Sequence, residues 1–322
     1  MSSRIPIFIA LLFAVVSAGH HRAMADEQRV SQGFVVPGVY YNDLGDTSAV
    51  GLTNVCSRTI DVYWVLADED DQVLARGQIS LPGHHVTPFL VADLSGMARV
   101  GRAATVGVPA ERRGVLIFAT DTNGDGAMHS DDMPCLFAEA FHADVAANDA
   151  IYLPVWPFGV DDIAPPPAPV PQGISDLAHM DAAPLTTLRS GVVDPPGVSD
   201  ALAFARYSIG GEDRTRLVVW SAEAAPMDAQ MRFYRTDGAN VTLSVPMQHS
   251  HLNVVDLEQL GGIPDDFTNG YVEWLLPQDQ IHYSDAVGSD GNGVAIYTVI
   301  HAPALGAAQT ILGRGDVVLR RP

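Results

Sequence analysis

The chain contains no lysine, so all 18 of its basic residues are arginines. A lysine amine forms the Schiff base of pyridoxal-phosphate enzymes and binds nucleotide phosphates in a P-loop. These enzyme classes are therefore excluded. The sequence also has no Gly-x-Ser-x-Gly motif, no His-Glu-x-x-His motif and no glycine-rich phosphate loop after a strand pattern. The sequence therefore contains none of these motifs that would indicate an enzyme.

Cysteine is almost as scarce, with only Cys56 and Cys135 in the whole chain. Neither has the spacing of a zinc site. In an oxidising compartment a disulfide between them is favoured, and closing so long a loop would stabilise the fold by about 4 kcal/mol. The alternative is two free thiols buried as small apolar side chains.

Long apolar runs are absent after the first residues. Residues 1–25 have the layout of a signal peptide: Arg4, an apolar run from Ile5 to Val16, and a small-x-small cleavage site that ends at Ala25. A buried N-terminal helix is the alternative. We expect cleavage after Ala25 and a soluble protein that is secreted or periplasmic, without membrane insertion.

Acidic residues outnumber basic ones by 38 to 18, which gives a net charge of −20. Such a surface repels nucleic acid and anionic membranes and favours cations. We therefore expect no nucleic-acid partner. The charge is compatible with either a protein or a glycan as the ligand.

A proline-rich stretch divides the chain. Residues 161–173 are typical of a semi-rigid polyproline linker, which separates predicted domains at 28–160 and 174–322. Both domains contain short β-branched and aromatic runs and no long helical period, which predicts an all-β fold. The clearest runs are Val62–Leu66, Val115–Phe118, Leu217–Trp220 and Val294–Tyr297.

The two domains repeat landmarks in one order, so we predict two related antiparallel β-sandwiches in tandem, immunoglobulin-like or jelly-roll-like. Each has a tyrosine, two hairpins, a proline, two histidines and a later glycine before an apolar strand. The matched residues are Tyr41 and Tyr207, Pro82 and Pro246, His84-His85 and His249/His251, Gly114 and Gly270, and His142 and His301.

One stretch, Asp121 to Asp132, has the oxygen-donor spacing of a calcium loop. Calcium takes six to eight hard oxygen ligands, so a loop must wrap carboxylates and carbonyls around one point. Oxygen-bearing side chains stand at positions 1, 3, 5 and 12, and glycine at position 6 permits a sharp turn. The predicted ligands are the side chains of Asp121, Asn123, Asp125 and Asp132 and the backbone carbonyl of Ala127.

These dozen residues resemble EF-hand-like calcium loops, and more closely the dockerin type, which closes with Asp at position 12. The resemblance implies one bound Ca²⁺, and the extracellular setting suggests a Kd on the order of 10⁻⁴–10⁻³ M. His129 stands at position 9, where the family has a small oxygen-bearing residue, so that contact is a water or is missing. An ordinary hairpin turn is the alternative, because Asn-Gly and Asp-Gly are favoured turn pairs.

The sequence flanking the loop predicts strands in place of the two EF-hand helices. Val115–Ala119 enters the loop and Cys135–Phe141 leaves it, and both are apolar and strand-like. We therefore expect the loop on a β-hairpin. The corresponding stretch of the second domain, Gln278–Gly293, is acidic but lacks the calcium spacing, which favours a solvated hairpin over a second site.

The histidine pairs and the four tryptophans favour structural roles. Histidines on a strand surface are far commoner than metal ligands, and no third ligand is evident. Trp64, Trp220 and Trp274 lie within apolar strand patterns, which indicates core positions, whereas Trp156 could pack at the domain junction.

The sequence thus predicts a secreted calcium-binding structural, adhesion or recognition protein without catalysis, whose layout resembles exported bacterial β-sandwich proteins. The alternatives are an extracellular hydrolase of glycans or esters, built from scattered acids and histidines, and a carbohydrate-binding module. The last would need solvent-facing tryptophans on one sheet.

Overall fold

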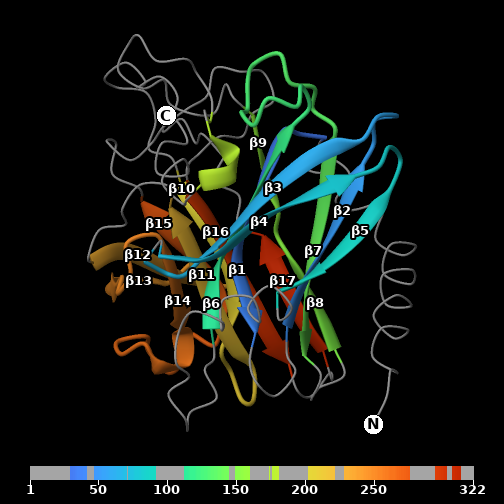
Figure 1. The fold of residues 1–322 in the computed structure, drawn as a ribbon. Helices are drawn as coiled ribbons and strands as arrows, with labels where there is room; N and C mark the ends of the chain where they lie inside the picture. The colour runs from blue at the N-terminus through green and yellow to red at the C-terminus, as the bar shows by residue number, and fades with distance from the viewer. Residues whose placement is uncertain are drawn as a thin grey trace, which may run out of the picture.

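The computed structural model (Figure 1) describes residues 30–41, 47–70, 72–91, 112–144, 149–159, 174, 176–180, 202–221, 228–275, 294–302 and 307–312. The described residues form antiparallel strands and two short 3-10 helices, η2 (Leu177–His179) and η3 (Leu257–Gln259). Among these residues, no helix has the length and apolar character needed to cross a membrane. The predicted all-β class is confirmed.

The first half of the chain forms a sheet that folds over itself into a sandwich. One layer has the strand order β4-β3-β6-β1, with β9 on β1, and the other has β5-β2-β7-β8; the layers join where β1 meets β2. The strands are β1 (Gly33–Tyr41), β2 (Thr47–Asn54), β3 (Ile60–Ala67), β4 (Val73–Leu81), β5 (Val86–Leu90), β6 (Arg112–Asp121), β7 (Leu136–Asp144), β8 (Asp149–Leu153) and β9 (Trp156–Phe158).

The second half forms a sandwich of two separate four-stranded sheets, ordered β10-β15-β12-β13 and β14-β11-β16-β17. Its strands are β10 (Leu202–Ser208), β11 (Arg214–Ser221), β12 (Asp228–Arg235), β13 (Asn240–Pro246), β14 (Leu252–Asp256), β15 (Asn269–Leu275), β16 (Val294–Ala302) and β17 (Ala307–Leu312).

The two sandwiches have the same topology. Replacing β1 to β8 by β10 to β17 in chain order converts β4-β3-β6-β1 into β13-β12-β15-β10, and β5-β2-β7-β8 into β14-β11-β16-β17. The landmarks fall at matching places: Gly114 and Gly270 lie in β6 and β15, and His142 and His301 lie in β7 and β16. Two related β-sandwiches in tandem are therefore confirmed.

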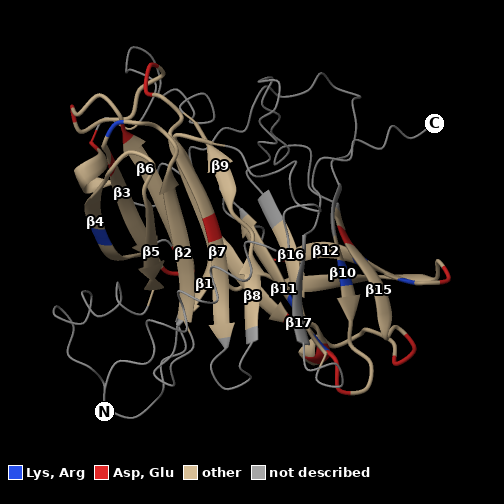
Figure 2. Cartoon of the chain, turned by 90° about the vertical axis from the view of Figure 1, so that its right-hand side faces the viewer, with Lys and Arg blue, Asp and Glu red and all other residues tan. Residues whose placement is uncertain are grey.

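A third apolar core joins the sandwiches to each other. Side chains on the outer faces of β3 and β6 pack against outer-face side chains of β11, β14 and β16. The sheets β4-β3-β6-β1 and β14-β11-β16-β17 are thus apolar on both faces and lie in the middle of a four-layer stack, which explains the uninterrupted apolar runs in their strands. Figure 2 shows the sandwiches side by side, with charged residues both on strands and in several of the connections between them.

Tyr297 on β16 is the central contact between the sandwiches. Its side chain is fully buried, and its hydroxyl donates to the carbonyl oxygen of Pro37 in β1 at 3.0 Å. Gly38 allows this approach, because its φ is +77° and a Cβ there would lie 2.2 Å from the tyrosine hydroxyl. Trp156 on β9 packs against Tyr297 with ring centroids 6.2 Å apart, at the junction as predicted.

The other tryptophans occupy cores, as their strand patterns predicted. Trp64 lies in the core of the first sandwich, Trp274 in that of the second, and Trp220 in the core between them. All three are at most 4% exposed. None of them offers a face to a ligand in solution.

Candidate functional site

The predicted calcium loop connects β6 to β7 at one end of the first sandwich. Asp121 is the last residue of β6, and Leu136, directly after Cys135, begins β7. The flanks are thus strands, as predicted, and the helices of an EF-hand are absent on both sides of the loop. The loop is an extended hairpin connection held by the sheet.

Asp121 folds the first half of the loop around its own carboxylate. The side chain is only 3% exposed, and it accepts hydrogen bonds from the backbone N–H groups of Asn123, Gly124 and Gly126. Both glycines have φ near +80°, a conformation that other residues rarely adopt. The sequence therefore wraps the chain around a buried carboxylate at position 1.

Asp132 closes the other end of the loop and is equally buried, at 3% exposure. One carboxylate oxygen accepts from the N–H and the hydroxyl of Thr122, at 3.0 and 2.7 Å, and the other accepts from the N–H of His129 at 2.7 Å. Positions 1 and 12 are thus brought to the same end of the loop.

Of the three remaining predicted ligands, two lie at the surface of the loop, whereas Ala127 is buried. Asn123 and Asp125 are exposed. Asp125 accepts from the N–H of Ala127 at 3.1 Å, and its second oxygen lies 3.1 Å from Nε2 of His129. No group of three or more His, Cys, Asp or Glu side chains is placed to hold a metal ion among the residues that the structure describes.

The electrostatic environment of the loop is negative. Burial raises the pKa of Tyr63 on β3, and the carboxylates of Asp121, Asp61 and Asp176 raise it further. Asp61 is the direct cross-strand neighbour of Asp121. Three carboxylates thus act on one side chain beside the loop, a field that favours a cation.

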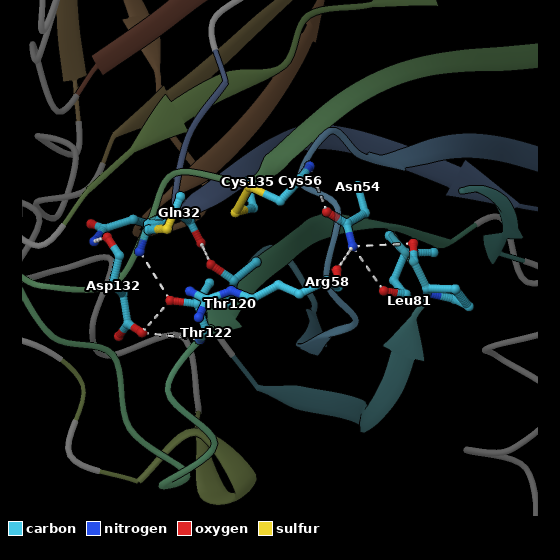
Figure 3. The surroundings of a disulfide bond; sticks show 11 residues. Gln32, Asn54, Cys56, Arg58, Leu81, Thr120, Thr122, Asp132 and Cys135 are labelled. Atoms are coloured by element: carbon cyan, nitrogen blue, oxygen red, sulfur yellow. Dashed lines mark hydrogen bonds between the residues drawn. A yellow bond between two sulfur atoms is a disulfide. The ribbon is translucent and has the colours of Figure 1, made fainter. Parts of the chain in front are cut away.

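Gln32, which no sequence pattern singled out, holds the loop from outside (Figure 3). Its side-chain amide donates to the carbonyl oxygens of His129 and Asp132, at 3.0 and 2.7 Å. The hydroxyl of Thr120 donates to the Gln32 carbonyl at 2.8 Å. A glutamine about a hundred residues away carries no local signal, so only the folded structure reveals this role.

The predicted disulfide between Cys56 and Cys135 is confirmed, with Cα atoms 5.3 Å apart. It joins the connection after β2 to the exit of the loop (Figure 3). Fully buried Asn54 supports it: its side-chain amide donates to the carbonyls of Arg58 and Leu81, and its carbonyl accepts from the N–H of Cys56 at 3.0 Å. The disulfide and Asn54 together hold the second half of the loop in place.

The loop also contacts the segment that leads into the second domain. The N–H of Leu177 in η2 donates to the Gly126 carbonyl at 2.9 Å, and the N–H of Met128 donates to the Ile174 carbonyl at 2.8 Å. Met128 is fully buried and belongs to the core between the sandwiches. The loop is therefore part of the domain junction.

Three predicted segments lie outside the described residues: the signal peptide at 1–25, the linker at 161–173, and the second-domain loop Gln278–Gly293. A scan against protein-family models found no match. Searches of the curated proteins and of the solved structures found none either.

Proposed function

We propose that this protein is an exported, non-catalytic structural or recognition protein, and that its loop from Asp121 to Asp132 binds one calcium ion. The main support is the pair of buried carboxylates at the two ends of the loop. Among the described residues, Asp121 and Asp132 are stabilised by N–H and hydroxyl donors, and no arginine pairs with either. A buried carboxylate without a cationic partner is costly, and a cation offsets that cost.

The residues present suit calcium in chemistry and in order. Asp121, Asn123, Asp125 and Asp132 would supply side-chain oxygens, and Ala127 would supply its carbonyl oxygen. These are the hard oxygen donors that calcium prefers. Bound calcium would supply positive charge, which removes the repulsion between the crowded carboxylates and stiffens the loop.

The proposed role reaches beyond the loop itself. Because Gly126 and Met128 are hydrogen-bonded to Leu177 and Ile174, stiffening the loop also orders the segment that covers the domain junction. We therefore propose that calcium stabilises the attachment of the two sandwiches to each other.

Calcium should raise the melting temperature of the protein. With a Kd on the order of 10⁻⁴–10⁻³ M, about 10 mM calcium stabilises the folded state by about 1.4–2.7 kcal/mol. That corresponds to an increase of about 3–8 °C in a calorimetric scan. Asp121→Ala and Asp125→Ala should each abolish the increase.

Asp131→Ala is the matched control, because Asp131 is an exposed acidic residue of the same loop at a position that supplies no ligand. It should keep the full calcium response. An identical melting curve with and without calcium in the wild type would contradict the proposal. An equal response in Asp125→Ala and Asp131→Ala would show a general charge effect in place of a site.

The carbohydrate-binding alternative loses its main premise in the structure. It required solvent-facing tryptophans, and Trp64, Trp220 and Trp274 are buried, whereas Trp156 packs against Tyr297. The hydrolase alternative has no specific observation in its favour among the described residues. The calcium-stabilised structural role therefore remains our proposal.

A further inference from the structure

His249 links the two sandwiches through acidic residues of the other domain. The histidine lies in the connection between β13 and β14. Its Nδ1 is 2.9 Å from a carboxylate oxygen of Asp70, and its Nε2 is 3.3 Å from a carboxylate oxygen of Glu69. Glu69 and Asp70 belong to the turn between β3 and β4. Each ring nitrogen thus faces a carboxylate from the first domain.

Both sides of this contact are held by their own hydrogen bonds. The N–H of His249 donates to the side chain of buried Asn253, and the amide of Asn253 donates back to the His249 carbonyl, at 2.9 and 2.8 Å. On the other side, the Asp68 carboxylate accepts from the N–H groups of Asp70 and Gln72. The imidazole is therefore presented to the carboxylates by two fixed turns.

We propose that His249 with Glu69 and Asp70 forms a pH-dependent latch that holds the two sandwiches together more tightly when the imidazole is protonated. Only the imidazolium form carries a proton on both ring nitrogens. It can donate to both carboxylates at once, and such charge-assisted bonds are about twice as strong as neutral ones. A neutral ring would turn an unprotonated nitrogen, and its lone pair, toward one carboxylate.

The pKa of Glu69 is shifted upward, mainly by burial. Burial raises the pKa of Glu69; the nearby His249 and Arg113 of β6 lower it, and Asp70 and Asp68 raise it, for a net rise above 4.5. A raised pKa in the folded protein gives stability that is present at low pH and is lost as the pH rises through it. Because a neutral imidazole has only one N–H for the two carboxylates, the latch should be weaker at about pH 8 than at about pH 5.5.

A double-mutant cycle across the domain junction tests the latch. The unfolding equilibrium constant is measured by urea denaturation for the wild type, His249→Gln, Asp70→Asn and the double variant, at about pH 5.5 and at about pH 8. We expect coupling of about fivefold to tenfold between the two positions at the lower pH and almost none at the higher pH. Asp70 is an exposed turn residue, so its replacement leaves the fold intact.

Two further variants separate the latch from a general effect of pH. His249→Arg carries a permanent charge and should keep its coupling with Asp70 at both pH values. His179→Gln is the matched control, because His179 pairs with Asp176 within its own short segment and, among the described residues, makes no contact of this kind across the domains. Coupling that is equal at both pH values, or absent at the lower one, would overturn the latch.

Discussion

Tyr297→Ala should lower the free energy of unfolding by about 3–5 kcal/mol, the loss typical of removing a large buried aromatic side chain. Tyr297 is fully buried between the sandwiches, packs against Trp156 and donates to the carbonyl oxygen of Pro37. Its removal opens a cavity between the two middle sheets and leaves that carbonyl without its donor. Urea denaturation followed by tryptophan fluorescence measures the loss.

Tyr297→Phe separates the hydroxyl from the ring. It keeps the packed ring and removes one buried hydrogen bond, so we expect a loss of about 1–2 kcal/mol. Burial raises the pKa of the Tyr297 hydroxyl, so it stays protonated, and its contribution is lost only above the usual tyrosine range of about 10.

Tyr271→Ala is the control, because Tyr271 is 44% exposed on the outer sheet and its loss should be smaller. Equal losses for Tyr297→Ala and Tyr271→Ala would contradict the proposed junction.

The double replacement Cys56→Ala and Cys135→Ala should lower the free energy of unfolding by about 4 kcal/mol. The disulfide closes a loop with a sequence separation of 79, and the unfolded chain gains that conformational freedom when the crosslink is removed. Chemical denaturation of the two proteins, each with calcium and without it, gives the difference.

The same replacement should also weaken the calcium response, because Cys135 fixes the exit of the loop beside Asp132. Treatment of the wild type with a thiol reductant is the matched control and should reproduce both losses without a change of sequence. A stability loss below about 1 kcal/mol would show that Asn54 and the β2–β7 pairing hold this end of the sandwich without the crosslink.

Much of the fold could be predicted from the sequence, and the reason lies in particular strands. Val62–Leu66, Val115–Phe118 and Leu217–Trp220 are apolar at successive positions, and all three lie in the middle sheets, where both faces are buried. In β12 the buried positions alternate with exposed ones, because one face of its sheet meets solvent. The unbroken apolar runs in these strands therefore also carried a signal of the second buried face, which the other domain covers.

The candidate site was predictable only in its local part. The positions of Asp121, Asp125 and Asp132 follow from spacing within twelve residues. The contacts that hold the loop come from Gln32 and Leu177, which are far away in the chain and have no motif. The same holds for His249: its pairing with Asp70 spans 179 residues and depends on how the sandwiches pack. Such contacts are set by tertiary structure, so a local pattern cannot reveal them.

Amide hydrogen exchange at Met128 and Leu177, with and without calcium, is the sharpest test of whether calcium orders the segment at the domain junction. These two N–H groups make the hydrogen bonds between the loop and the segment at the domain junction. We expect about 10 mM calcium to slow their exchange about tenfold or more in the wild type and to leave it unchanged in Asp125→Ala. Exchange at both amides that is the same with and without calcium in the wild type would contradict it.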